Sequence, residues 1–178
     1  MGFSISWLAI RGKSKADVLR ELRLCDTAEV DRVNESPVSG AELPTGWYVL
    51  FLNDVLHPYI ELPALQRLSE GCEVVGAQVE EHVMVSASFS YRNGKRQWNI
   101  THEAEKGLEN LETEGAPPQV FEDARARNLK LQVEKGEGVD YIFEVPLEVA
   151  EAVCGYRHDR WKFDWGEPQF TALSALSS

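Results

Sequence analysis

The chain has 178 residues and a formal net charge of -11, from 29 acidic and 18 basic side chains. Its hydrophobic content of 43% and aromatic content of 10% are typical of a globular protein with a sizeable core, which excludes an intrinsically disordered chain. A surface with this acidic charge repels nucleic-acid phosphates and anionic lipids. We therefore expect neither nucleic acid nor a membrane as partner. The charge attracts a protein with a basic surface, or serves only to maintain solubility.

The three cysteines, Cys25, Cys72 and Cys154, lie far apart among apolar residues and form no C-x-x-C pair. This pattern favours free, buried thiols in a reducing compartment and predicts no intrachain disulfide. The first residues contain too short an apolar run for a signal peptide, and the basic residues follow that run instead of preceding it. No apolar run approaches the length of a membrane span. We therefore expect a cytoplasmic protein.

The first half of the chain alternates between strand and helix patterns. Residues 3–10 have the period of a strand, and Ser14 precedes a helix as a capping residue would. Residues 26–44 are acidic and without a clean period, so we expect a long loop that carries a functional surface. Residues 46–53 are apolar on both alternating faces, which predicts a central strand, and Pro63 begins a short helix.

The clearest local signal is a β-hairpin. The longest strand pattern, residues 72–91, leads into Asn93-Gly94, the dipeptide preferred in a type I′ turn. A turn centred there makes Phe89 and Trp98 buried cross-strand neighbours. One face would then be apolar and hold Val85, Ala87, Phe89, Tyr91, Trp98 and Ile100. The other would be polar and hold Ser86, Ser88, Ser90, Gln97, Asn99 and Thr101, so we expect a sheet with one buried and one polar face.

The second half continues the mixture of elements. Residues 108–114 predict a further strand and residues 118–134 a helix with Val120, Phe121, Ala124 and Leu131 buried. Residues 140–145 have the composition of a strand, and Pro146 lies in the first turn of a helix that ends before Gly155.

The only pairing that these patterns specify is antiparallel. We therefore predict an α+β fold, a mostly antiparallel sheet with three to four flanking helices, in a single domain over residues 1–178. Residues 166–178 are expected to be extended or partly disordered.

Glu80, Glu81 and His82 form the first candidate for chemistry. Glu81 interrupts an apolar alternation, and a carboxylate buried there would have a raised pKa and could act as a general base. The predicted register instead places Glu81 opposite Lys106 and His82 opposite Glu105, as expected where a sheet leaves its core or bends at a bulge. We favour the second interpretation.

The histidines show no metal-ligand spacing. The predicted register puts Val85 opposite His102, which separates His82 and His102 by roughly 10 Å along the strand, too far for one ion. His57 and His158 lie in other segments. The sequence also lacks a phosphate-binding loop and a nucleophile elbow. We predict no metal, no cofactor and no catalytic residue.

The stretch 156–165 is the strongest binding candidate, because aromatic and arginine side chains are enriched at interface hot spots. Its candidate contacts are Tyr156, Arg157, His158, Arg160, Trp161 and Trp165. In a competing interpretation the stretch is a last strand. Its inward face would hold Trp161, Phe163 and Trp165, and its outward face Arg160, Lys162 and Asp164. A mixture of the two is a third interpretation.

Three segments resemble recurrent blocks of small, uncharacterised bacterial proteins of similar length. They are SGAELPTGWYVLFLND, EVVGAQVEEHVMVSASFSYRNGKRQW and DYIFEVPLEVAEAVCGYRHD. The resemblance implies a bacterial cytosolic origin. It implies no activity, so it assigns no role to any residue.

Two hypotheses of function follow. The first is a non-catalytic, acidic protein-interaction module of a bacterial cytosol, such as an immunity protein or antitoxin, whose partner has a basic surface. The second is a small hydrolase-like enzyme with a pocket near Glu80, Glu81 and His82. A flat acidic patch with exposed aromatic residues would favour the first, and a pocket with a buried carboxylate or imidazole the second. We favour the interaction module, and leave open a small-molecule ligand and the oligomeric state.

Overall fold

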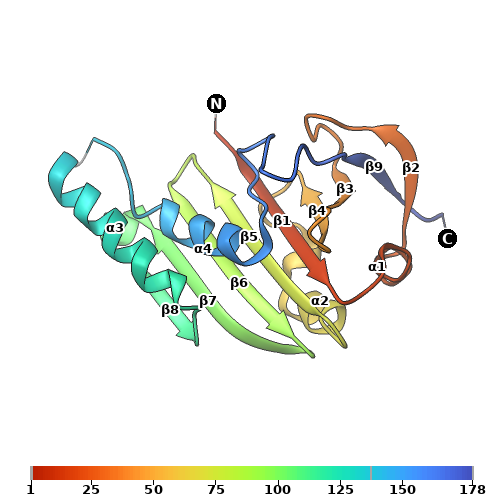
Figure 1. Ribbon diagram of the computed structural model, residues 1–178, viewed down its shortest axis with the longest axis horizontal. Helices are drawn as coiled ribbons and strands as arrows, with labels where there is room; N and C mark the ends of the chain where they lie inside the picture. The colour runs from red at the N-terminus through yellow and green to blue at the C-terminus, as the bar shows by residue number, and fades with distance from the viewer. Residues whose placement is uncertain (1, 137, 178) are drawn as a thin grey trace.

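The computed structural model describes residues 2–136 and 138–177, which form an α+β fold around one wholly antiparallel sheet (Figure 1). The strands are β1 (Ser4–Arg11), β2 (Leu24–Val30), β3 (Val38–Glu42), β4 (Tyr48–Leu52), β5 (Glu73–Glu80), β6 (Val85–Arg92), β7 (Lys95–Glu103), β8 (Glu112–Gly115) and β9 (Thr171–Ala175). Their order in the sheet is β2-β9-β3-β4-β1-β5-β6-β7-β8. The helices are α1 (Lys15–Leu22), α2 (Leu62–Leu68), α3 (Val120–Lys135) and α4 (Glu144–Cys154), with 3-10 turns η1 (Pro58–Ile60) and η2 (Ala104–Lys106). The predicted fold class is confirmed.

The middle of the sheet is buried on both faces. Every residue of β4 is buried, and so are the six residues of β1 from Ile5 to Ile10. Strands that are covered on both sides have near-continuous apolar runs, and the sequence pattern predicted this for residues 46–53. The strands predicted at residues 3–10 and 46–53 are thus confirmed.

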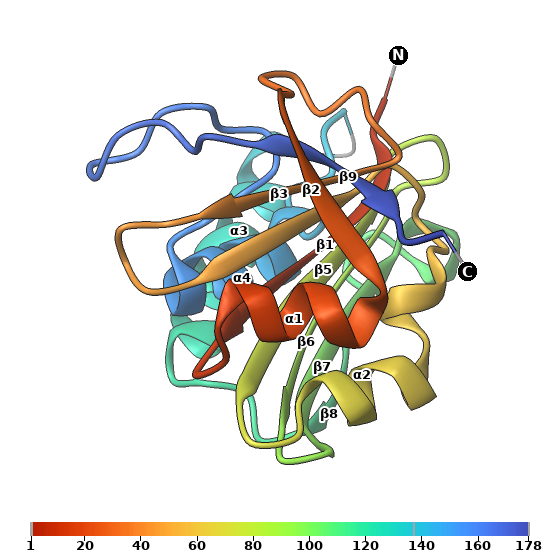
Figure 2. The ribbon, with the colours of Figure 1, turned by 90° about the vertical axis from the view of Figure 1, so that its right-hand side faces the viewer.

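Helices cover opposite faces of the sheet. One core lies under α4 and α3 and includes Trp7, Val79 and Leu147. The other lies under α1 and α2 and includes Leu8, Val18 and Leu65. Figure 2 shows α1 and α2 in front of the sheet and α3 and α4 behind it. The expectation of one polar sheet face is therefore wrong.

The predicted hairpin forms, but its register changes after the second residue pair from the turn. Arg92 lies opposite Lys95 as predicted, whereas Ser90 lies opposite Trp98 and Phe89 opposite Asn99. The extra residue is Gln97, which makes a β-bulge and reverses the faces of all later β7 side chains. Phe89 and Trp98 are both buried, but they belong to different cores, so the predicted contact between them is wrong.

The serines of β6 lie on the buried face that α4 covers. Ser86 and Ser88 are fully buried, and the Ser86 hydroxyl donates a 2.7 Å hydrogen bond to the Phe143 carbonyl just before α4. Alternation alone cannot separate a small polar residue beneath a helix from one in water. The predicted polar face was wrong for this reason.

Three further segments differ from the sequence prediction. Residues 26–44 contain part of β2 and all of β3, so the expected long loop is confined to the short connection between these strands. Residues 72–91 are two strands separated by a turn at 81–84, where Met84 has a φ of 51°. Residues 140–145 are a turn leading into α4 because the Asp140 carboxylate accepts a hydrogen bond from the Phe143 amide and opens the helix instead of a strand.

Helix α3 forms where the sequence predicts it, but its inner face is partly polar. Phe121 and Ala124 are buried as expected, whereas Asn128 and Gln132 take the next inward positions. The Gln132 amide donates to the Val139 carbonyl and accepts from the Tyr141 amide. The helix therefore secures the loop that precedes α4.

The C-terminal segment is an interior strand. β9 lies between β2 and β3, and β2 has no other partner in the sheet. Part of the stretch 166–178 is thus extended, as expected, and it completes the sheet; residue 178 lies outside the described residues.

The observed register makes a prediction about Gly76, which pairs with Phe89. A Cβ atom at residue 76 would lie 2.6 Å from two ring atoms of Phe89. We expect Gly76→Ala to lower the free energy of unfolding by about 1–3 kcal/mol, because it overpacks the core. Phe89→Leu in the same chain should recover part of that loss, as measured by urea unfolding. Gly138→Ala, at a residue with open space around it, is the matched control. Strict additivity of the two changes would contradict the register.

A second prediction concerns β9. Deleting residues 171–178 should leave β2 unpaired while β4, β1 and β5 keep their partners. Hydrogen exchange measured by mass spectrometry should then show loss of protection at Leu24 to Asp26 and retained protection in β1. A chain shortened only after Leu176 should exchange as the full chain does. Unchanged protection of β2 in the longer deletion would contradict the topology.

Candidate functional site

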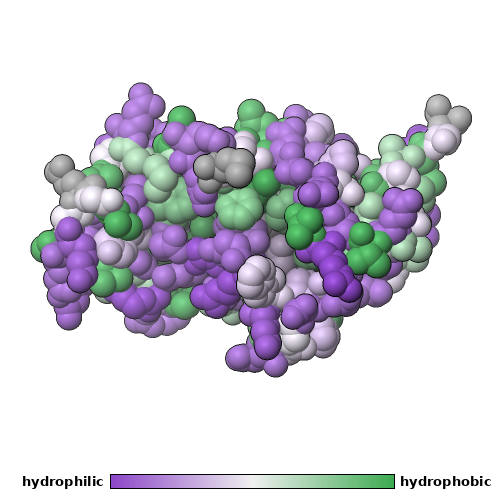
Figure 3. All heavy atoms as spheres, turned by 90° about the horizontal axis from the view of Figure 1, so that it is seen from above, coloured by the Kyte–Doolittle hydropathy of each residue, from purple (hydrophilic) through white to green (hydrophobic). Residues whose placement is uncertain are grey.

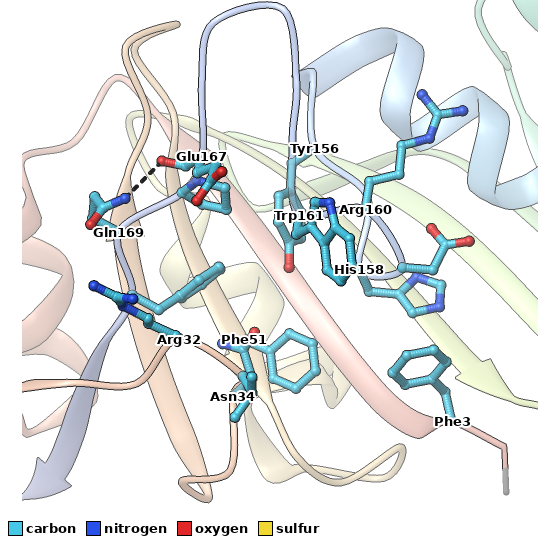
Figure 4. A pocket seen from close by; sticks show the side chains of 14 residues that line it. Phe3, Arg32, Asn34, Phe51, Tyr156, His158, Arg160, Trp161, Glu167 and Gln169 are labelled. Atoms are coloured by element: carbon cyan, nitrogen blue, oxygen red, sulfur yellow. Dashed lines mark hydrogen bonds between the residues drawn. The ribbon is translucent and has the colours of Figure 1, made fainter.

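Both sequence-predicted sites lie at one end of the sheet, the upper end in Figure 1. β1 begins there, β4 and β5 end there, and the connections 31–37 and 156–170 cross it. A pocket of about 350 Å³ opens between these connections (Figure 4). Its lining comes from the start of β1, the end of β4 and both connections. The tertiary structure thus joins Phe3, Asn34 and Phe51 to the predicted stretch 156–165.

The floor of the pocket is aromatic and rigidly packed. Phe51, Tyr156 and Phe170 are buried, and the Phe170 ring lies edge-on to the other two, at centroid distances of 6.4 Å to Phe51 and 5.9 Å to Tyr156. Tyr156 also packs edge-on against the buried Trp7 at 5.2 Å. Rings locked in this way form a preorganised surface that a ligand does not have to order.

The rim of the pocket exposes large apolar side chains. Trp161 is 83% exposed, Val33 is 72% exposed and Phe3 is 39% exposed. Figure 3 views this end of the molecule, where green apolar side chains stand between purple hydrophilic ones. We call Phe3, Val33 and Trp161, with the pocket between them, the rim surface. Exposed apolar residues that gather around a pocket are typical of a binding surface.

Two of the four charged groups that line the pocket are neutralised by partners outside it. Arg160 extends away from the opening and pairs with Glu151 of α4 at 2.6 Å (Figure 4). Asp159 pairs with Arg157 at 2.7 Å. Among the described residues, the lining residues Arg32 and Glu167 form no ion pair. They are the charges available to a ligand.

Arg157, one of the candidate contacts predicted from the sequence, is buried. Its side chain is 7% exposed and forms a second ion pair, with Glu144 at 2.6 Å. Burial acts to lower the pKa of the guanidinium, but the hydrogen bonds to Glu144 and Asp159 outweigh it and raise that pKa. A charge held in this way joins α4 to the connection 156–170. Arg157 is therefore removed from the candidate contacts.

His158 lies in the wall of the pocket against Phe3, edge-on at a centroid distance of 4.7 Å. Its Nδ1 atom is buried without a hydrogen-bond partner. Burial lowers the pKa of His158 to about 4, against the opposing effect of the Asp159 carboxylate. The imidazole is therefore uncharged at neutral pH.

The remaining aromatic residues of the stretch complete the core instead of a strand. Phe163 and Trp165 stack at a centroid distance of 4.7 Å, and the Trp165 indole donates to the Gly155 carbonyl at 3.3 Å. A tight turn bridges Phe163 to Gly166. Tyr156, His158, Arg160 and Trp161 line the pocket, whereas Phe163 and Trp165 pack against the core.

The alternative site at Glu80, Glu81 and His82 has its side chains engaged locally. Glu80 accepts hydrogen bonds from Ser4 and from His82, and these bonds, the one from Ser4 foremost, lower its pKa. Glu81 accepts a 2.9 Å hydrogen bond from the Phe3 amide. The pocket beside them, of about 460 Å³, is open and shallow on the turn 81–84. This is the end of the sheet, as the favoured interpretation expects.

The partners predicted across from these residues are wrong, because the bulge at Gln97 shifts the register. Glu103 lies opposite Val85, and His102 lies opposite Ser86. Lys106 pairs with Glu103 at 2.7 Å and with Glu112 at 3.0 Å, so it does not reach Glu81.

The sequence pattern did not predict a buried pair of His102 with Asp140. His102 is fully buried, with Nδ1 at 2.6 Å from the Asn110 carbonyl and Nε2 at 2.7 Å from the Asp140 carboxylate. The carbonyl can only accept, so Nδ1 carries a proton. A histidine with no exposed atom has no contact with a substrate, so we assign this pair to holding β7 against the loops at 110 and 140.

In residues 2–136 and 138–177, no three histidine, cysteine or acidic side chains gather where they could hold a metal ion. No helix in that part of the chain combines the length and apolarity needed to cross a membrane. The described cysteines are free: Cys72 and Cys154 are buried, and Cys25 is half-buried in β2.

His158 yields a prediction of pH dependence. Its pKa in the folded state is about 4, below its usual 6.5, so the unfolded chain binds the proton more readily between these values. Stability is therefore lost as pH falls from about 6.5 to 4, by roughly 2–3 kcal/mol. Urea unfolding at several pH values should show a smaller loss in His158→Leu than in the unchanged protein. His82→Gln, at an exposed histidine, should keep the full loss, and an unchanged slope in His158→Leu would contradict the assignment.

No family model, curated protein or solved structure matches the chain.

Proposed function

We propose that this protein is a non-catalytic interaction module that binds another protein with a basic surface, and that the rim surface is the contact. The observation that carries the proposal is Trp161, which is 83% exposed beside Val33 and Phe3 over an aromatic pocket. Tryptophan is the residue most typical of interface hot spots when a partner buries it in a well-packed place.

The energy available at Trp161 supports this proposal. An indole side chain buries on the order of 200 Å² in a contact, and at roughly 25 cal/mol per Å² this favours association by about 5 kcal/mol before the costs of binding. The floor beneath it is already ordered by the contacts of Phe51, Tyr156 and Phe170. A preformed contact loses less free energy to ordering.

The charge of the chain supports a basic partner. The net charge of -11 acts over the whole molecule, whereas the lining of the pocket has equal numbers of acidic and basic residues. A field of this kind increases the rate of encounter with a basic protein, and the rim surface then determines how long the complex lasts. By analogy of size and acidity, the proposed partner class includes a basic toxin in a bacterial cytosol.

The alternative, a hydrolase-like enzyme at Glu80, Glu81 and His82, has less support. Glu80 has a lowered pKa, which opposes a role as a general base at neutral pH. Glu81 is occupied by the Phe3 amide, and the side chain of His102, the partner of Asp140, is fully buried.

The test is binding to purified proteins encoded by neighbouring genes, measured by surface plasmon resonance. We expect Trp161→Ala to weaken binding 10- to 100-fold, mainly through faster dissociation. Glu35→Lys, at an exposed residue near the rim, should slow association, and salt should do the same. Glu35 is chosen over Asp31, because the Asp31 carboxylate is buried and caps the amides of Glu35 and Ser36.

The matched control is Val133→Ala, at a residue of α3 that is 75% exposed and distant in sequence from the rim. It should bind as the unchanged protein does. A complex that ignores Trp161→Ala, Glu35→Lys and salt would contradict the proposal. Turnover of a small molecule that Glu81→Gln abolishes with the fold intact would favour the enzyme.

A further inference from the structure

The pocket at the rim surface has room for a long side chain. Its volume is about 350 Å³, near the lower end of the range of roughly 300–1,000 Å³ that is typical of small-ligand pockets. A partner helix or loop that rests on Phe3, Val33 and Trp161 can place one long side chain between them. The chemistry of that side chain can be inferred from the lining.

The aromatic lining favours a cation. Phe51, Tyr156, Phe170 and Trp161 all line the pocket, and an arginine guanidinium is attracted to aromatic faces by their quadrupole. The same molecule already contains such a contact, because the guanidinium of Arg11 lies 4.4 Å from the centre of the Trp47 ring. Arginine also stacks flat on rings, which a lysine ammonium does not do.

The charges at the pocket support the same choice. The Glu167 side chain lines the opening and, among the described residues, has no ion-pair partner (Figure 4). Arg160 is directed to Glu151, and His158 is uncharged at neutral pH because burial lowers its pKa. Arg32 is the remaining cation of the lining, and it opposes a positive ligand.

We propose that the pocket binds an arginine side chain of the basic partner, with its guanidinium against Trp161 and paired with Glu167. The proposal rests on the proposed function, since it names the group that the partner inserts. Arg32 then reduces the affinity for the inserted arginine, and its removal should strengthen binding.

The test uses N-acetyl-arginine methylamide and its uncharged isostere, N-acetyl-citrulline methylamide. Each is titrated into the ¹⁵N-labelled full chain, and the indole and backbone signals around Trp161 are followed by NMR. We expect the arginine compound to bind at millimolar concentration, at least about 5-fold more tightly than the citrulline compound.

Three variants separate the contributions. Trp161→Ala and Glu167→Gln should each weaken the arginine compound by about 3-fold or more, and Arg32→Gln should strengthen it by a similar factor. Glu29→Gln, at an exposed carboxylate outside the pocket lining, is the matched control and should change binding little. Equal binding of both compounds would show an apolar pocket and overturn the proposal. Loss of binding in Arg32→Gln would show that Arg32 supports the bound compound instead of opposing it, with the same consequence.

Failure of this proposal can be told apart from failure of the proposed function. If neither compound binds but Trp161→Ala still weakens the protein complex, the interaction module stands and the arginine pocket is rejected. If the arginine compound binds but the protein complex ignores Trp161→Ala, the proposed interface is rejected and the pocket is a site for another arginine-containing ligand.

Discussion

Burial of the antiparallel sheet on both faces is the constraint on which the rest of the structure depends. Helices α3 and α4 cover one face and α1 and α2 the other. The alternation of side chains along a central strand therefore does not separate a buried apolar face from an exposed polar face. The serines of β6 lie under α4, where small side chains allow close packing. Gly76 leaves room on the opposite face for the ring of Phe89. The bulge at Gln97 places Trp98 and Phe89 on opposite faces of the sheet, so each ring packs in a different core.

Because helices cover both faces, the pocket lies at the end of the sheet where β1 begins and β4 and β5 end. The connections 31–37 and 156–170 cross that end, and Arg157 fixes the second of them to α4 through Glu144. Packed aromatic rings at the floor of a pocket and charged side chains at its opening are a common arrangement in binding sites, because a rigid scaffold positions the binding residues of the loops. The exposed Trp161 lies on such a fixed connection.

Charge acts on two length scales here. The net charge of -11 sets a field that reaches about a Debye length, roughly 8 Å at physiological salt. Within the pocket, Arg160 is neutralised by Glu151 and Asp159 by Arg157. Glu167 and Arg32 are therefore the charges that determine which ligand the pocket accepts. In the proposed complex, steering and selection depend on different residues and can be changed separately.

The sequence by itself determined the class of the fold, the central strands, the capped helix α1 and the stretch that carries the binding candidates. Those features depend on local periodicity, turn chemistry and composition, which act over a few residues. Only the tertiary structure decided the bulge at Gln97, the strand role of β9 and the buried pair of His102 with Asp140. Each depends on a partner distant in the chain, and a one-residue shift reverses a strand without changing its pattern. For the same reason the sequence predicted only part of the candidate site. Tyr156 and Trp161 could be identified by their residue type, whereas Phe3, Phe51 and Glu167 could not, because only the fold brings them to the same pocket.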